Sequence, residues 1–97
     1  MPKGYIIAHV TVTDPEAYKL YQQTGGPVFA RHGAKFLVRG GAQTTVEGDM
    51  RPRSVILEFP NLQAATACYN SPEYQAAILL RSGASTADIC LIEGYDG

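Results

Sequence analysis

The sequence has little charge, only two cysteines and no tryptophan. Charged residues make up 18% of the 97 residues, and eight basic against nine acidic residues leave a formal net charge of −1. No basic stripe interleaved with aromatic residues occurs, so nucleic acid is not expected as a partner. No apolar run approaches the length of about 18 residues that a membrane span needs. The first residues lack the apolar region of a signal peptide, and we expect a cytoplasmic protein.

The two cysteines, Cys68 and Cys90, each lie within an apolar pattern. This favours small, buried and reduced side chains over a disulfide or redox pair. The chain has no Cys-x-x-Cys, and the two histidines, His9 and His32, have no acidic residue at metal-ligand spacing. We therefore expect no metal site and no cofactor. Haem is the weakest alternative, because only these histidines and cysteines could ligate it.

The first strand, predicted from Tyr5 to Thr13, has two faces that are both largely apolar or amphipathic. One face consists of Ile6, Ala8, Val10 and Val12, and the other of Tyr5, Ile7, His9 and Thr11. One face takes the helices. A chain of 97 residues, expected to form one domain over 1–97, has little left to cover the other. The pattern therefore predicts a homodimer formed through an exposed sheet face.

Two similar capping sequences predict where helices begin. Asp14-Pro15-Glu16 and Ser71-Pro72-Glu73 each place a capping side chain before a proline in the first helical turn. The first helix is expected to break or kink at Gly25-Gly26-Pro27, with a short second piece ending before Gly33. A further helix is expected from Leu62 to about Tyr69, with Asn61 as its capping residue.

Three more segments have the composition of strands. They are Lys35–Arg39, Ser54–Phe59 and Ala87–Tyr95, with a polar loop over Gly40–Arg53 and a short loop over Gly83–Thr86. The order of elements is then β-α-β-β-α-β. This order predicts an α+β fold of the ferredoxin-like kind, in which an antiparallel sheet carries its helices on one face.

A set of motifs spread over nearly the whole chain carries a resemblance to a known family. The motifs are Asp14-Pro15-Glu16-Ala17-Tyr18 with Tyr21, His32-Gly33, Phe36-Leu37-Val38-Arg39-Gly40-Gly41, Glu47-Gly48, Arg53, Glu58-Phe59-Pro60, and Ser71-Pro72-Glu73-Tyr74 with Arg81. In this order they resemble the bacterial domain of unknown function 1330 family, within the dimeric α/β-barrel superfamily. The sequence departs from the family pattern at Gly25-Gly26-Pro27.

The resemblance implies a ferredoxin-like protomer, two sheets packed face to face in a dimer, and a pocket between the sheet and the helices of each protomer. It implies no activity, because the family has no agreed reaction. The wider superfamily includes cofactor-free monooxygenases, lactone isomerases and haem-handling members.

Two residues are the best candidates for catalysis. His32 is a candidate general base or anion ligand, and its alternative role is a histidine stabilised by a helix end. Arg39 could hold a carboxylate or an enolate. The interruption of an apolar strand by Glu58 instead favours a structural pair between Glu58 and Arg39.

The candidate ligand-binding residues form a larger set. They are Tyr21, His32, Arg39, Tyr69, Tyr74 and Arg81. Phenols and a guanidinium around an apolar cleft suit a small aromatic or acidic ligand, while the alternative is amphipathic packing with polar tips at the surface. Two functions stay open. One is a small-molecule-binding dimer, and the other is a cofactor-independent monooxygenase or isomerase acting on a small enolisable or aromatic substrate.

Overall fold

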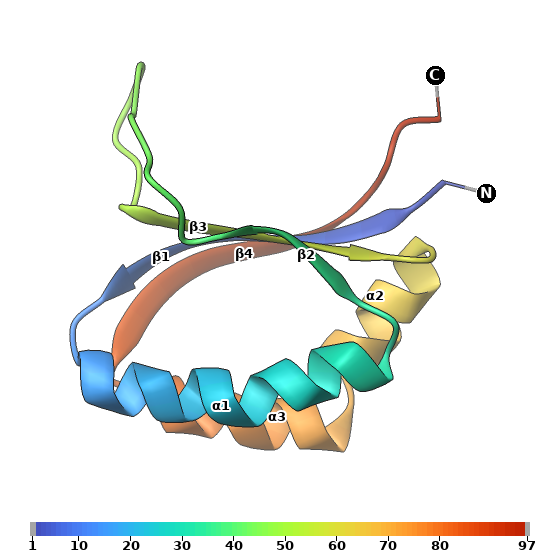
Figure 1. Ribbon diagram of the computed structural model, residues 1–97, viewed down its shortest axis with the longest axis horizontal. Helices are drawn as coiled ribbons and strands as arrows, with labels where there is room; N and C mark the ends of the chain where they lie inside the picture. Colours follow the sequence, from blue (N-terminus) through green and yellow to red (C-terminus); the bar gives the residue numbers. More distant parts are fainter. Residues whose placement is uncertain (1, 97) are drawn as a thin grey trace.

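The computed structural model describes residues 2–96 and has one antiparallel sheet with its helices on one face (Figure 1). The elements are β1 (Gly4–Val12), α1 (Pro15–Arg31), β2 (Lys35–Arg39), β3 (Arg53–Phe59), α2 (Leu62–Tyr69), α3 (Pro72–Ile78), a 3-10 turn (Leu79–Arg81) and β4 (Ser85–Glu93). The strand order is β2-β3-β1-β4. The predicted ferredoxin-like βαββαβ fold is confirmed.

The two faces of β1 have different environments. Ile6 and Val10 are buried beneath the helices, with exposed fractions of 4% and 3%. Ile7 and His9 point to the opposite side of the sheet and are only partly buried. This alternation follows the period of two along a strand. The predicted division of β1 into a helix-facing side and an outer side is therefore confirmed.

Helix α1 continues through Gly25-Gly26-Pro27, so the predicted break is wrong. Gly25 is buried, and a Cβ atom there would lie 3.6 Å from the ring of Tyr21 and 3.8 Å from that of Tyr74. Gly25 therefore lies where α1 packs against the tyrosine rings, at ordinary van der Waals distance. Val28 and Phe29, beyond the proline, are buried on the same side. This packing offsets the backbone hydrogen bond that Pro27 cannot donate.

All three predicted helix caps are present. The side chain of Asp14 accepts a hydrogen bond from the Ala17 N–H at 3.2 Å, and those of Asn61 and Ser71 accept from Ala64 and Tyr74 at 2.8 and 3.2 Å. Each cap satisfies an N–H group that the first turn leaves free.

Among the helices of residues 2–96, none has the length and apolar character that crossing a membrane requires.

Two sequence expectations near the last strand need correction. β4 begins at Ser85, which pairs with Val12, and so it includes part of the predicted loop Gly83–Thr86. The antiparallel pairing with β1 sets this boundary, since the polar residues at the start of β4 gave no strand pattern. Cys68 is buried as expected, whereas Cys90 lies exposed on the outer side of β4.

Strand β2 contains an irregularity that changes which side chains face the helices. Phe36 pairs with Leu57 and Val38 with Ile56, so β2 has one more residue than β3 over this stretch. Such a bulge interrupts the alternation of side chains. In a regular strand Phe36 and Arg39 would point to opposite faces. Here both point toward the helices.

Candidate functional site

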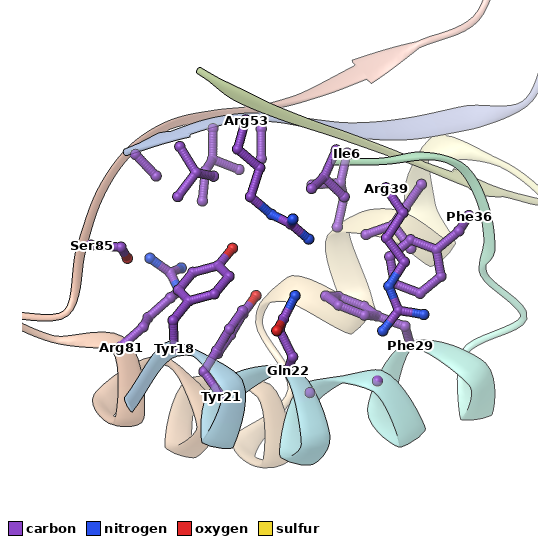
Figure 2. A pocket seen from close by; sticks show the side chains of 18 of the residues that line it. Ile6, Tyr18, Tyr21, Gln22, Phe29, Phe36, Arg39, Arg53, Arg81 and Ser85 are labelled. Atoms are coloured by element: carbon purple, nitrogen blue, oxygen red, sulfur yellow. The ribbon is translucent and has the colours of Figure 1, made fainter. Parts of the chain in front are cut away.

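A cavity lies between the sheet and the helices, and the centre of a water molecule can occupy about 50 Å³ of it. Its floor is a set of apolar side chains from three strands: Ile6, Ala8 and Val10 of β1, Val55 and Leu57 of β3, and Ala87 and Ile89 of β4. Residues of α1 and α3 form the opposite wall (Figure 2). The structure therefore has an open space between the sheet and the helices, where the family resemblance implied a pocket.

Tyr21 and Tyr74 meet on the helix wall, as the sequence suggested. Their hydroxyl oxygens lie 2.6 Å apart and share a hydrogen bond, and both side chains are buried. Burial and the neighbouring Tyr74 phenol raise the pKa of Tyr21 far above its ordinary value, and burial also raises the pKa of Tyr74. Both phenols are therefore neutral at physiological pH. In their shared hydrogen bond one donates and the other accepts, and neither is an ionised base.

Arg81 completes this part of the wall from the 3-10 turn. Its guanidinium lies 5.1 Å from the centre of the Tyr21 ring. Burial lowers the pKa of Arg81, but the phenols of Tyr74 and Tyr21 raise it by more than burial lowers it. The net pKa is therefore raised, and the side chain stays charged. Tyr69 packs behind Tyr74, with ring centres 5.5 Å apart, and does not line the cavity. Three of the predicted ligand-binding residues therefore lie together, and Tyr69 supports them.

Arg39 lines the cavity at its solvent side because of the irregularity in β2. Its guanidinium lies 4.4 Å from the centre of the Phe36 ring. Glu58 faces the other side of the sheet, where its carboxylate accepts a hydrogen bond from the Tyr5 hydroxyl at 3.3 Å. The favoured structural pair between Arg39 and Glu58 is therefore wrong, since the two side chains lie on opposite faces.

Neither histidine is part of the cavity lining. His32 caps the end of α1, and its Nδ1 lies 2.9 Å from the carbonyl oxygen of Val28. This is the position of a histidine that interacts with the negative end of a helix. His9 lies on the outer face, with its Nδ1 3.0 Å from the Ser54 hydroxyl. A catalytic role for His32 stays a prediction that the cavity geometry does not support.

Four other polar residues line the cavity and were not among the predicted ligand-binding residues. They are Tyr18, Gln22, Arg53 and Ser85. Tyr18 and Arg53 carried a signal, because both belonged to the family motifs, although neither had an assigned role. Tyr18 and Gln22 have helical spacing to Tyr21 and Gly25, and this spacing was the available sign that they share a helix face.

The charged side chains of the lining are all arginines, which can only donate hydrogen bonds. Arg39, Arg53 and Arg81 line the cavity, while no aspartate or glutamate does so in the part of the chain that the structure describes. Among those same residues, no group of three or more metal-ligating side chains comes together. The arrangement suits a ligand with hydrogen-bond acceptors and an apolar body.

We expect the free energy of unfolding to fall when the pH rises above about 10, because of Tyr21 and Tyr74. Below their ordinary pKa of 10.0, the folded and unfolded chains both keep the phenol protons. Above it the unfolded chain releases protons that the folded chain still holds, so stability is lost, by about 1.4 kcal/mol per pH unit for each group. Urea titrations from neutral pH to about pH 11 measure this slope.

The Tyr21→Phe variant should show a shallower alkaline slope than the wild-type protein, because one of the two groups is gone. Tyr95→Phe is a matched control, since Tyr95 is 94% exposed and should leave the slope unchanged. An equal slope in all three proteins would contradict the assigned burial of the phenol pair.

The fold and the cavity define a ferredoxin-like α+β protein with an open space between the sheet and the helices. The chain belongs to the family described as "Domain of unknown function (DUF1330)", whose model matches residues 3–95. No curated protein matches the chain.

Solved structures share the fold at low sequence identity. A protein of unknown function from Rhodopseudomonas palustris is 20% identical, with a TM-score of 0.77 over 99% of this chain and 85% of that one. A dimeric protein of unknown function with a ferredoxin-like fold, from Bacteroides fragilis, is 13% identical, with a TM-score of 0.63 over 94% and 95%. The cofactor-independent oxygenase SnoaB from Streptomyces nogalater is 15% identical, with a TM-score of 0.63 over 100% and 97%.

Proposed function

We propose that this protein is a homodimer that binds a small organic ligand, aromatic or acidic, in the cavity between the sheet and the helices of each protomer. The observation that carries the proposal is the cavity itself. It has an apolar floor, and its polar groups are gathered on the helix wall and at the ends. This combination is typical of small-molecule sites, where apolar contacts supply affinity and a few polar groups fix orientation.

The outer face of the sheet supports the dimer. A row of apolar side chains crosses all four strands there, formed by the paired residues Val38, Ile56, Ile7 and Cys90. Polar pairs flank this row, including Tyr5 with Glu58 on one side and His9 with Ser54 on the other. An apolar centre with a polar rim is the usual anatomy of a protein interface.

The shape of the chain around this face agrees with a second copy lying on it. The loop 40–52 and the C-terminal segment both project from the side of the sheet away from the helices (Figure 1). Val46 in this loop is 87% exposed, and Tyr95 in the C-terminal segment is 94% exposed. The structural relative from Bacteroides fragilis is described as dimeric.

Light scattering tests the proposed dimer, and it should give about twice the chain mass of 10.4 kDa.

Small-molecule binding is favoured over a cofactor-independent oxygenase or isomerase by the chemistry of the lining. Removing a proton from an enolisable substrate needs a base close to it. The described lining contains no carboxylate and no histidine, and the pKa of Tyr21 is raised, which opposes its use as a base. The oxygenase from Streptomyces nogalater shares the fold with this chain. Sustained oxygen uptake with an enolisable aromatic acid would favour the enzymatic alternative instead.

Thermal unfolding in the presence of small aromatic acids and their neutral analogues tests the binding function. A ligand at about ten times its Kd should add roughly 1.4 kcal/mol to the free energy of unfolding. The Gly26→Leu variant should fold and lose this stabilisation. Gly26 lines the cavity, and a Cβ atom there would meet nothing within 4 Å, so a leucine side chain is expected to extend into the cavity and occupy part of it.

Ala30→Leu is the matched control, because Ala30 lies exposed on the same helix. It should respond to the ligands as the wild-type protein does. The proposed site is wrong if no compound stabilises the wild-type protein, or if Gly26→Leu is stabilised equally well.

A further inference from the structure

Three buried polar atoms lack a hydrogen-bond partner in the described part of the chain, and all belong to residues that line the cavity. They are Arg53 Nε, Arg81 Nε and Ser85 Oγ. Buried polar groups are nearly always paired, because an unpaired one loses its hydration without compensation. Three such atoms around one space make the cavity a place where a bound molecule would find polar partners.

The unpaired groups identify the chemistry of such a molecule. Both Nε–H groups can only donate, and a serine hydroxyl can donate as well. A partner for all three must therefore be an acceptor. The charges agree, since the described lining has three arginines and no carboxylate to balance them. The ion pair that the described residues form, Arg51 with Asp88 at 3.1 Å, lies outside the cavity.

Arg53 and Arg81 are arranged around the same pair of rings. The Arg53 guanidinium lies 5.7 Å from the centre of the Tyr18 ring, and that of Arg81 lies 5.1 Å from the Tyr21 ring. The two rings are themselves 5.3 Å apart. Figure 2 shows Arg53 descending from the sheet into the cavity, with Arg81 and Ser85 at the end opposite Arg39.

Gly40 leaves the space that the Arg53 side chain occupies. A Cβ atom at Gly40 would collide with the Arg53 guanidinium, and the backbone there has a φ of +68°, which favours glycine. The Arg53 guanidinium therefore lies against the turn that follows β2 while it also lines the cavity.

We infer that Arg53, Arg81 and Ser85 form an anion subsite for the carboxylate of an organic acid, whose apolar body lies over the floor of the cavity. This inference rests on the proposed binding function and adds the charge and orientation of the ligand. A carboxylate fits best, because its planar pair of oxygens matches the donor fork of a guanidinium. The apolar floor excludes a ligand that is polar throughout, such as free phosphate.

The test compares probes of matched size, in which the carboxylate of each acid is replaced by a neutral amide. Benzoate and phenylacetate are titrated at millimolar concentration against benzamide and phenylacetamide, with inorganic phosphate as a further probe. Nuclear magnetic resonance of ¹⁵N-labelled protein reports on the Nε–H signals of Arg53 and Arg81 directly. The acids should shift both signals and bind roughly ten- to a hundredfold more tightly than the amides, as expected for hydrogen bonds to a charged group.

Variants then assign the subsite. Arg81→Met and Arg53→Met should each weaken benzoate binding by roughly tenfold or more. Arg31→Met removes the same charge from an exposed position at the end of α1 and should change nothing. The resonance measurement on the wild-type protein decides the matter even if a variant fails to fold.

Each other outcome is informative. Equal binding of acids and amides overturns the anion subsite and leaves the proposed binding function standing. Binding of phosphate as tight as that of the acids overturns the carboxylate assignment. A loss confined to Arg39→Met would place the anion at the mouth and overturn the assigned residues. Binding of neither series would contradict both the proposed function and this inference.

Discussion

Replacing Phe59 with alanine is expected to lower the free energy of unfolding by about 3–5 kcal/mol. Phe59 is only 1% exposed and is one of the largest fully buried side chains. It ends β3 and points toward the helices. Its removal would leave a void among neighbours that are fixed by the sheet on one side and α2 on the other. The loss is large against the 5–15 kcal/mol that stabilises a typical domain.

Urea unfolding at one protein concentration measures the effect of Phe59→Ala. Leu20→Ala is the matched control, because Leu20 is 56% exposed on α1 and its truncation should change stability by about 0.5 kcal/mol or less. A loss below about 1 kcal/mol for Phe59→Ala would mean that the core closes over the void. Such a result would contradict the close packing inferred for this end of the sheet.

The parts of the fold that the sequence predicted depend on short-range patterns. The alternation along β1 follows from strand geometry, and the caps at Asp14, Asn61 and Ser71 follow from hydrogen bonding within one helical turn. Both effects involve residues close together in the chain. The order of elements then limits the topology to a few choices, of which the ferredoxin-like arrangement is one.

The parts that the sequence did not predict depend on contacts between distant segments. Helix α1 passes through Gly25-Gly26-Pro27 because α3 packs against it there, and the chain between these elements is long. Local propensity alone favours a break at this point. A helix that is supported by tertiary packing can accommodate the proline.

The irregularity in β2 explains why the place of Arg39 in the candidate site could not be predicted. The sequence could not show that β2 has an extra residue between Phe36 and Val38, so the face of Arg39 and its relation to Glu58 could not be known. The register of β2 against β3 decides both. Arg53 was missed for a similar reason, since its guanidinium lies beside Gly40, a contact between residues distant in the chain. By contrast, Tyr74 and Arg81 were predicted together because their helical spacing is local.

Replacing Ile56 with lysine is expected to convert the proposed dimer into a monomer. Ile56 lies in the middle of the apolar row on the outer face, where it pairs with Ile7 of β1 and Val38 of β2. In a face-to-face dimer, the twofold axis would place two copies of the new charge inside one interface. A buried charge without a partner costs several kcal/mol, which exceeds what a small interface could offset.

The choice of position makes the Ile56 experiment decisive. Light scattering should give about the chain mass for Ile56→Lys, and circular dichroism should show that the fold is kept. Leu79→Lys introduces the same charge at a residue that is 74% exposed on the helix side, and it should remain a dimer. If Ile56→Lys does not fold, Val38→Lys on the edge strand β2 tests the same face, because Val38 is already 38% exposed. Dimers that persist in both outer-face variants would mean that the sheets do not meet, and that the apolar row serves another purpose.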